Sequence, residues 1–275
     1  MKRYPFDDKK ILVCGHRGLG IYGIENTMTA FKMAIEAGVD MLETDVHMTR
    51  DGHLVLMHDE RVDRTTNGTG LIKDLTLEEI KTLDATVNKT IDTPSEPPST
   101  LSELLRLAKK HPRVLLNIEL KDYPEADEGL AYASAKTACD MILKSGLSGR
   151  TWINSFSGRL LAFVYREYGD AFYYHGFYPW FILGEMPIDP ESFIDVACMQ
   201  HRELLADGTV VKCADNMCPE EWFTYLKEKG VMPLMAPSLK EYPLYDLAFS
   251  YGSRIVNSDD PEKMIKHLRE CGLHD

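Results

Sequence analysis

Residues 11–58 read ILVCGHRGLGIYGIENTMTAFKMAIEAGVDMLETDVHMTRDGHLVLMH, and their pattern decides the fold. A compact apolar run at 11–15 is typical of a buried strand. Apolar residues then recur at helical spacing over 26–38, and two further strand-like runs follow at 41–46 and 53–58. A strand, a helix and a strand in this order predict an α/β protein, whose parallel strands are joined by helical crossovers.

The same alternation continues to the end of the chain. Further strand-like runs lie at 114–120, 151–156, 172–177, 209–213, 231–236 and 254–258. Helical patterns lie at 101–111, 131–145, 159–168, 190–199, 219–229, 244–251 and 261–271. These runs give nine strand candidates, one more than a closed barrel needs, and the assignment over 172–213 stays open. No GxxxxGK(S/T) motif follows a strand, which argues against a P-loop protein, and an eight-stranded (β/α) TIM barrel is favoured over a doubly wound sheet.

Residues 59–98 interrupt this alternation. The segment is polar, is rich in Thr and Asp, contains the turn pair Asn67-Gly68, and ends in PSEPPS. One short helix is expected in it, at 76–83. Because the alternation resumes afterwards, we expect a small inserted subdomain within a single barrel domain that spans residues 1–275.

Composition excludes several classes of function. The chain has 275 residues and a formal net charge of −12, and such a surface repels polyphosphate, which argues against general nucleic-acid binding. The six cysteines form no CxxC pair, which argues against a zinc knuckle and against a disulfide framework. Neither a signal peptide nor an apolar run of about 18–20 residues is visible. We therefore expect a cytoplasmic protein without stable membrane insertion.

Charged residues and histidines stand at the carboxyl ends of four successive strand candidates. They are His16, Arg17, Glu43, Asp45, His58, Glu119 and Lys121. Glu43 and Asp45 are two residues apart, so both side chains point to one face of their strand, and the same holds for Glu119 and Lys121. Because a TIM barrel carries its chemistry at the carboxyl ends of its strands, these residues are expected to share one site.

The three carboxylates predict a metal. Acids inside apolar runs such as MLETDV and LLNIEL are buried charges, which are costly unless they are paired or bound to a metal. A hard divalent cation, Mg²⁺ or Ca²⁺, would relieve the repulsion between Glu43, Asp45 and Glu119 by taking their oxygens as ligands. The lack of clustered Cys and His beside them argues against zinc or copper.

The remaining residues of this set suit phosphodiester cleavage. Arg17 and Lys121 can bind phosphoryl oxygens beside the cation and spread the developing charge. His16 and His58 can divide the general acid and general base roles near neutral pH, and which of them is the acid stays open. These cations also supply the local positive charge that an anionic substrate needs on an acidic protein.

Ordered motifs along the chain closely resemble those of the glycerophosphodiester phosphodiesterase family. The family's H-R-G, E-N-T, E-x-D-V, D-G, H-D, R-T-T-x-G and E-x-K elements are similar to His16-Arg17-Gly18, Glu25-Asn26-Thr27, Glu43-Thr44-Asp45-Val46, Asp51-Gly52, His58-Asp59, Arg64-Thr65-Thr66-Asn67-Gly68 and Glu119-Leu120-Lys121. The resemblance is dense over 11–121 and scattered beyond. One departure is Met232-Pro233, on the strand where the family usually has Trp-Thr, and it predicts a changed wall on the substrate side.

The resemblance implies a barrel with a small inserted subdomain. It also implies a divalent metal on Glu43, Asp45 and Glu119, catalytic His16 and His58, and phosphate binding by Arg17 and Lys121. The reaction would be hydrolysis of a small glycerophosphodiester to glycerol 3-phosphate and an alcohol. The alcohol, the choice between Mg²⁺ and Ca²⁺, and the oligomeric state stay open.

Rival functions use parts of the same apparatus. Paired carboxylates on barrel strands also serve glycosidases, which need neither a metal nor phosphate-binding cations. A non-catalytic phosphodiester-binding protein would not need both histidines. A phospholipase-D-like or phosphoinositide-cleaving relative would share the machinery and differ in substrate, although no basic amphipathic helix favours work at a membrane surface.

Other residues near the expected site have ordinary structural explanations. His47 is expected on the strand face opposite Asp45, and His175 is expected to be packed in the interior. Phe156, Tyr178 and Trp180 could line the alcohol side of a substrate site, but core packing is the default for such aromatic residues.

Overall fold

The computed structural model describes residues 10–213, 217–236 and 241–275. Residues 1–9, on which the expectation about a signal peptide depends, lie outside the described residues. Among the helices of the described ranges, none combines the length and the apolar character that crossing a membrane requires.

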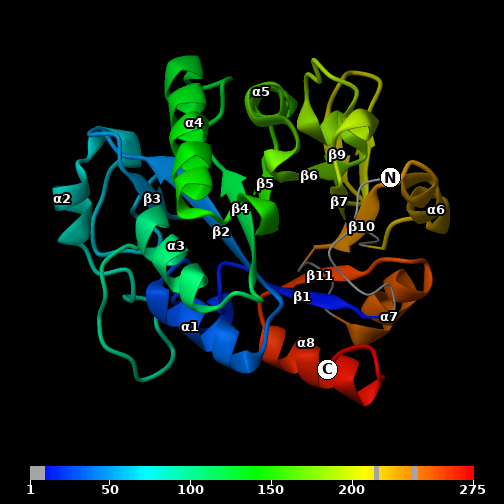
Figure 1. The fold of residues 1–275 in the computed structure, drawn as a ribbon, viewed down its shortest axis with the longest axis horizontal. Helices are drawn as coiled ribbons and strands as arrows, with labels where there is room; N and C mark the ends of the chain where they lie inside the picture. Colours follow the sequence, from blue (N-terminus) through cyan, green and yellow to red (C-terminus); the bar gives the residue numbers. More distant parts are fainter. Residues whose placement is uncertain (1–9, 214–216, 237–240) are drawn as a thin grey trace.

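Eight parallel strands form a closed barrel, which confirms the predicted fold class. In chain order they are β1 (Leu12–Gly15), β2 (Met41–Met48), β4 (Leu115–Leu120), β5 (Thr151–Asn154), β6 (Tyr173–Tyr178), β7 (Val196–Met199), β10 (Met232–Met235) and β11 (Ile255–Ser258). Strand β1 pairs in parallel with both β2 and β11, so the sheet closes on itself. The first and last strands of the barrel therefore lie side by side (Figure 1).

Helices surround the barrel and form most of the crossovers. They are α1 (Met28–Ala37), α2 (Leu77–Lys81), α3 (Leu101–Lys110), α4 (Glu128–Ser145), α5 (Gly158–Tyr168), α6 (Glu220–Glu228), α7 (Tyr242–Ser250) and α8 (Pro261–Glu270). Local sequence sets their ends. The Thr27 side chain caps α1 by accepting from the Ala30 amide, and Gly38 ends that helix with a φ of 96°. A reciprocal capping box between Thr100 and Glu103 starts α3.

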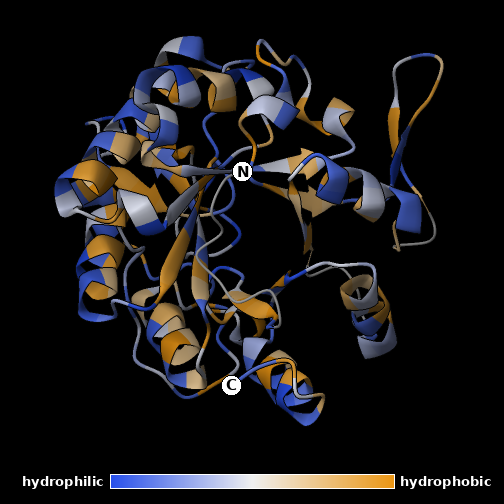
Figure 2. Ribbon diagram, turned by 45° about the vertical axis from the view of Figure 1, so that its right-hand side comes forward, coloured by the Kyte–Doolittle hydropathy of each residue, from blue (hydrophilic) through white to orange (hydrophobic). Residues whose placement is uncertain are grey.

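The apolar interior lies in and around the barrel strands. Every residue of β1, β2, β7 and β11 is buried. Figure 2 shows largely apolar strands at the centre and helices of mixed hydropathy around them. Strands enclosed on both faces show no clean alternation of apolar and polar residues, so a charged residue among them needs a specific partner.

The assignment of the nine strand candidates was partly wrong. The candidate at 53–58 is β3 (Leu54–Leu56), which pairs antiparallel to β2 and stays outside the barrel. The candidate at 209–213 is β9 (Val210–Lys212), which forms a separate hairpin with β8 (Arg202–Leu204). The missing barrel strand is β7, from within 190–199, where the sequence pattern predicted a helix.

The physical reason for the missed strand is the composition of β7. Its residues VACM are continuously apolar, and such a short run cannot be told from a buried helical turn by periodicity. Pro190, which resembles a helix start, begins only the short 3₁₀ turn η6 (Pro190–Ser192). The connection from β6 to β7 therefore contains 3₁₀ turns and no α-helix.

Residues 59–98 contain the 3₁₀ turn η2 (Ile72–Asp74) and α2. They share a small apolar cluster with the end of β3, separate from the main core. The buried members of this cluster are Val55, Met57, Val62, Ile72 and Ile80. The segment leaves the barrel after β3 and returns at α3.

Candidate active site

The structure brings all seven predicted site residues to the carboxyl ends of neighbouring strands. His16 and Arg17 follow β1, Glu43 and Asp45 lie in β2, Glu119 lies in β4, Lys121 follows β4, and His58 follows β3. The register pairs Asp45 with Glu119 across β2 and β4. One carboxylate oxygen each from Glu43, Asp45 and Glu119 lies within 4.8 Å of the others, and all three residues are buried.

The turn after β1 brings Arg17 to these carboxylates. Arg17 has a φ of 54°, and its backbone amide donates a hydrogen bond of 2.8 Å to Glu43 Oε2. Its Nε atom lies 3.4 Å from Asp45 Oδ2. Gly18 follows with a φ of 82°, and a Cβ atom there would lie 2.8 Å from the backbone of Ala30 at the start of α1. Glycine is required because this turn packs directly against a helix.

Lys121 neutralises part of the charge of the carboxylates. Its Nζ atom lies 2.5 Å from Glu119 Oε1 and 3.2 Å from Asp45 Oδ1. Burial favours the neutral form of Asp45, but Lys121 and Arg17 outweigh it and lower the pKa of that carboxyl. The opposite holds for Glu43, whose pKa burial and the neighbouring Asp45 raise to about 8. Burial also raises the pKa of Glu119.

These charges fit a divalent cation. Three buried carboxylates face two basic side chains, Arg17 and Lys121, so the acids outnumber the cations that contact them. The donor set consists of oxygen atoms, which are the ligands that Mg²⁺ and Ca²⁺ prefer. The residues present therefore fit the predicted metal class.

Each of the two histidines is held at Nδ1 by an aspartate. His16 Nδ1 donates to Asp259 Oδ1 over 2.5 Å, and His58 Nδ1 donates to Asp59 Oδ1 over 2.6 Å. His16 Nε2 is then the nitrogen that faces the carboxylates, 3.9 Å from Glu43 Oε2. Burial lowers the pKa of His16, but Glu43 and Asp259 outweigh it and raise the pKa. Such a pair fixes the tautomer and the orientation of the imidazole ring.

Further charged residues connect the two sides of the site. Arg64 donates to Asp59 over 2.5 Å, and also to both Glu25 oxygens, over 2.7 and 2.9 Å. Arg17 donates to Glu25 over 3.0 Å. Arg64 and His58 outweigh burial and lower the pKa of Asp59 to about 2. The result is a continuous network from His58 through Arg64 and Glu25 to Arg17.

Asn26 orients one of the carboxylates. Its amide donates to Asp45 Oδ2 over 2.9 Å, while its Oδ1 accepts from the Thr44 hydroxyl over 2.7 Å. It is buried and has a φ of 58°, a backbone conformation that asparagine tolerates better than most residues. Sequence analysis gave no role to Asn26, Glu25, Arg64 or Asp259. The signal was available, because all four stand in the quoted motifs or in the polar run after the last strand.

His175 and His47 have structural roles. His175 is buried in β6, with its Nδ1 3.2 Å from Asn117 Oδ1, and burial lowers its pKa to about 3, as expected for a packed residue. His47 bonds to Asp122 over 2.8 Å and to the His58 carbonyl over 3.3 Å. The expectation that His47 lies on the face opposite Asp45 was wrong, since residues two apart in a strand share a face.

An open groove adjoins the site at the ends of β4, β5 and β6. It has a volume of about 640 Å³, and its lining includes Tyr123, Phe156 and Arg159. Lys121 Nζ lies 5.7 Å from the centre of the Phe156 ring, so the groove begins beside the candidate phosphate-binding residue. Tyr178 and Trp180 instead pack against each other, with ring centres 5.2 Å apart.

Met232 does not line this side of the barrel. It is the first residue of β10 and pairs with Val196, the first residue of β7, so it lies at the amino ends of the parallel strands. The expected change to the substrate wall at Met232-Pro233 was therefore wrong in its location. The residue of β10 nearest the carboxyl ends is Met235, which is buried.

Comparisons with known proteins relate this chain to one family. The model of the glycerophosphoryl diester phosphodiesterase family matches residues 16–212. A glycerophosphodiester phosphodiesterase of Caldanaerobacter subterraneus is 48% identical over 128 residues, which cover 45% of this chain and 52% of that protein. One of Bacillus subtilis is 36% identical over 166 residues, which cover 57% of this chain and 56% of that protein. The match thus spans about half the length of these relatives.

Solved structures share the fold over nearly the whole chain. A glycerophosphoryl diester phosphodiesterase structure from Silicibacter pomeroyi has a TM-score of 0.77 at 21% identity, and covers 96% of this chain and 95% of that one. A phosphodiesterase from Oleispira antarctica, in complex with the product sn-glycerol-3-phosphate, has a TM-score of 0.74 at 21% identity, covering 94% and 97%. The family model matches more than half of the sequence, and the chain belongs to the glycerophosphoryl diester phosphodiesterase family.

Proposed function

We propose that this protein hydrolyses small glycerophosphodiesters to glycerol 3-phosphate and an alcohol, using one Mg²⁺ or Ca²⁺ ion. The observation that carries the proposal is the convergence of three buried carboxylates with two histidines, each held at Nδ1 by an aspartate. The family match supports the same reaction class.

Glu43, Asp45 and Glu119 would hold the cation. When bound, it supplies Lewis-acid polarisation of a phosphoryl oxygen and offsets the negative charge of the phosphodiester. Arg17 and Lys121 bind the two non-bridging oxygens alongside the cation and stabilise the charge that develops on them. Lys121 contacts both Glu119 and the Phe156 ring, which lines the groove. The phosphate would therefore bind beside Lys121, and the alcohol portion would extend into the groove along Phe156.

His16 and His58 move the protons. One removes a proton at Nε2 from the attacking water, and the other donates a proton from Nε2 to the oxygen of the departing alcohol as its bond to phosphorus breaks. Asp259 and Asp59 hold the Nδ1–H of each ring, so Nε2 is the atom left to exchange a proton with substrate. Either histidine can serve as the base with the other as the acid, and both assignments balance.

We also propose that residues 59–98 are a subdomain inserted into a single barrel domain. Its contribution to the site is the ion pair between Arg64 and Asp59, which orients His58. The segment packs around a small apolar cluster, shared with the end of β3 and separate from the main core, which supports a structural unit of its own. The six scattered cysteines, which form no CxxC pair, support a reducing compartment, and hence a cytoplasmic location.

The test is release of glycerol 3-phosphate from glycerophosphocholine, glycerophosphoethanolamine and glycerophosphoglycerol, with Mg²⁺, with Ca²⁺ and after chelation. The proposal expects turnover of at least one substrate that stops on chelation and returns with the ion. Turnover of long-chain phospholipids alone would favour a phospholipase-D-like activity instead. Turnover of none, with retained substrate binding, would favour a phosphodiester-binding protein.

A further inference from the structure

A second group of metal-ligand side chains lies on the β8–β9 hairpin. This hairpin follows β7 and precedes α6, with Arg202 opposite Lys212 in its ladder. The backbone amide of Cys213 donates to the His201 carbonyl over 3.0 Å, so these two residues face each other at the base of the hairpin. Glu203 is two residues from His201 and therefore projects from the same face.

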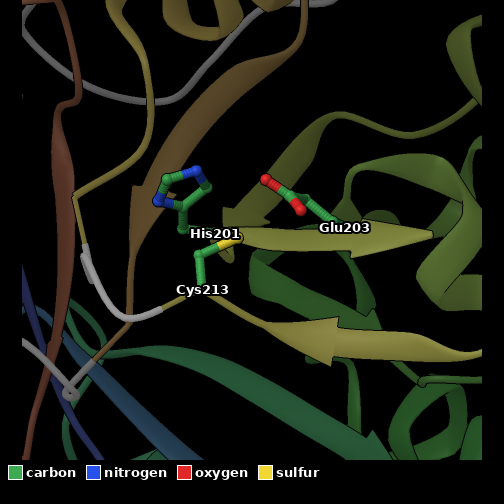
Figure 3. Close-up of side chains that lie close together, drawn as sticks. All are labelled: His201, Glu203 and Cys213. Atoms are coloured by element: carbon green, nitrogen blue, oxygen red, sulfur yellow. The ribbon is translucent and has the colours of Figure 1, made fainter. Parts of the chain in front are cut away.

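The donor atoms of these three residues converge. One ligand atom each from His201, Glu203 and Cys213 lies within 4.8 Å of the other two. Figure 3 shows the imidazole, the carboxylate and the thiol pointing toward one another from the two strands of the hairpin. None of the three belongs to the candidate active site, so this group is a separate feature of the molecule.

We propose that His201, Glu203 and Cys213 bind a transition-metal ion of the Zn²⁺ class. A sulfur, an imidazole nitrogen and a single carboxylate oxygen match the preferences of Zn²⁺, whereas Mg²⁺ and Ca²⁺ require several oxygen ligands. The thiolate and the carboxylate balance the two charges of the ion. Three protein ligands leave the fourth tetrahedral position for water, which the exposed side of Glu203 admits.

The surroundings give the ion a structural purpose. A two-stranded hairpin without a core of its own is at best marginally stable, and this hairpin exposes Leu204, Leu205 and Val210. A metal ion bound by His201 and Cys213 would link the two ends of the hairpin. This link would lower the conformational entropy that the hairpin has when it is open. The Trp222 ring of α6 packs edge-on against His201, with ring centres 5.6 Å apart, and so orients the imidazole.

A comparable trio on α7 and α8 provides the internal control. Asp246, His267 and Cys271 also bring their donor atoms within 4.8 Å. In that trio, His267 Nε2 bonds to Asp246 over 2.8 Å, and the Tyr242 ring stacks on its imidazole. These contacts explain that trio as a link between two helices. Matched variants of the two trios therefore distinguish a specific metal site on the hairpin from nonspecific metal binding by exposed Cys and His.

The experiment titrates the reduced full-length protein with Co²⁺ and Zn²⁺, with excess Mg²⁺ present to occupy the carboxylate site. Wild type should bind one ion that shows a thiolate-to-Co²⁺ charge-transfer band and that Zn²⁺ displaces. Cys213→Ser should abolish the band. His201→Ala and Glu203→Gln should weaken affinity by at least the roughly 10–100-fold typical of outer partners of a metal site. Cys271→Ser and His267→Ala should leave both the charge-transfer band and the metal affinity unchanged.

A wild-type protein without the band would overturn the proposal, as would a band that survives Cys213→Ser and disappears in Cys271→Ser. Hydrogen exchange in the wild type gives a measurement that needs no variant. Zn²⁺ should slow the exchange of the amides of residues 202–212, and unchanged exchange at saturating Zn²⁺ would contradict the structural role. Hydrolysis of glycerophosphodiesters with Mg²⁺ is measured separately. Its outcome does not decide whether the hairpin binds a metal ion.

Discussion

Two sides of the same barrel rim differ in chemistry. The side formed by β1, β2 and β4 carries buried acids, Arg17 and Lys121 in a connected network. The side formed by β6, β7 and β10 presents aromatic packing and a projecting hairpin, and its strands are predominantly apolar. On the first side each charge depends on its neighbours, so a change to one charged residue affects the others. The second side can vary in its loops without disturbing that network.

The largest expected effect tests whether the chemistry is confined to the first side. Asp45→Asn removes the charge of a proposed metal ligand that Lys121, Arg17 and Asn26 also contact. Loss of about 4 kcal/mol of transition-state stabilisation would lower kcat roughly a thousandfold. Glycerol 3-phosphate release should fall accordingly, and calorimetry should show weakened Mg²⁺ binding.

Glu203→Gln is the matched control for that experiment, because it neutralises a carboxylate on the other side of the rim. Its kcat should stay within a few-fold of wild type. Equal losses in the two variants would remove the distinction between the sides. Unchanged Mg²⁺ affinity in Asp45→Asn would remove Asp45 from the metal site.

The next effect concerns the two histidines. His16→Ala and His58→Ala should each lower kcat by about 10²–10⁴-fold, the usual contribution of a general acid or base. The wild-type pH–rate profile should be bell-shaped, and each variant should lose one limb of it. His201→Ala, on the hairpin, should retain both limbs and nearly full kcat. If either active-site variant stays within a few-fold of wild type, the two-histidine mechanism is wrong.

A smaller effect is expected from the aspartates that hold the histidines. Asp259→Asn and Asp59→Asn each replace a charge-assisted hydrogen bond worth about 1.5–3 kcal/mol, so kcat should fall roughly 10–100-fold. In the wild type, burial lowers the pKa of His16 while Glu43 and Asp259 raise it. Removing the charge of Asp259 should therefore shift the limb that belongs to His16 to lower pH. A lower kcat with an unmoved limb would leave Asp259 a purely structural role.

The same contrast explains how much the sequence could predict. Acids at Glu43, Asp45 and Glu119 stand out inside apolar runs, so both the strands and the shared site were predictable. β7 contains no such marker, and its four apolar residues fit the helical period as well as a strand. The strand becomes recognisable only through its pairing with β6 and β10. Local pattern does not contain that tertiary information.

Partners of the site residues were harder to predict than the residues themselves. Asp259 lies 243 positions from His16 in the chain, and closure of the barrel between β1 and β11 brings them together. Arg64, within residues 59–98, reaches Glu25, which lies between β1 and α1. Contacts between residues so distant in the sequence cannot be predicted from local spacing. By contrast, the spacing of two residues within one strand directly predicts that Glu43 and Asp45 share a face.

The smallest effect compares a glycine from each side of the rim by its contribution to stability. Gly18 and Gly208 have nearly the same φ, 82° and 87°, so alanine meets a similar left-handed penalty of about 1–2 kcal/mol at either position. At Gly18 the new Cβ would also lie 2.8 Å from the backbone carbon of Ala30, whereas at Gly208 it would meet nothing within 4 Å. Overpacking of a close contact adds about 1–3 kcal/mol.

Urea unfolding should therefore show a loss of about 2–5 kcal/mol for Gly18→Ala. Gly208→Ala should cost at most about 1–2 kcal/mol, and less if the hairpin frays before the barrel unfolds. Equal losses would mean that the hairpin unfolds together with the barrel and that the turn after β1 yields to an added methyl group.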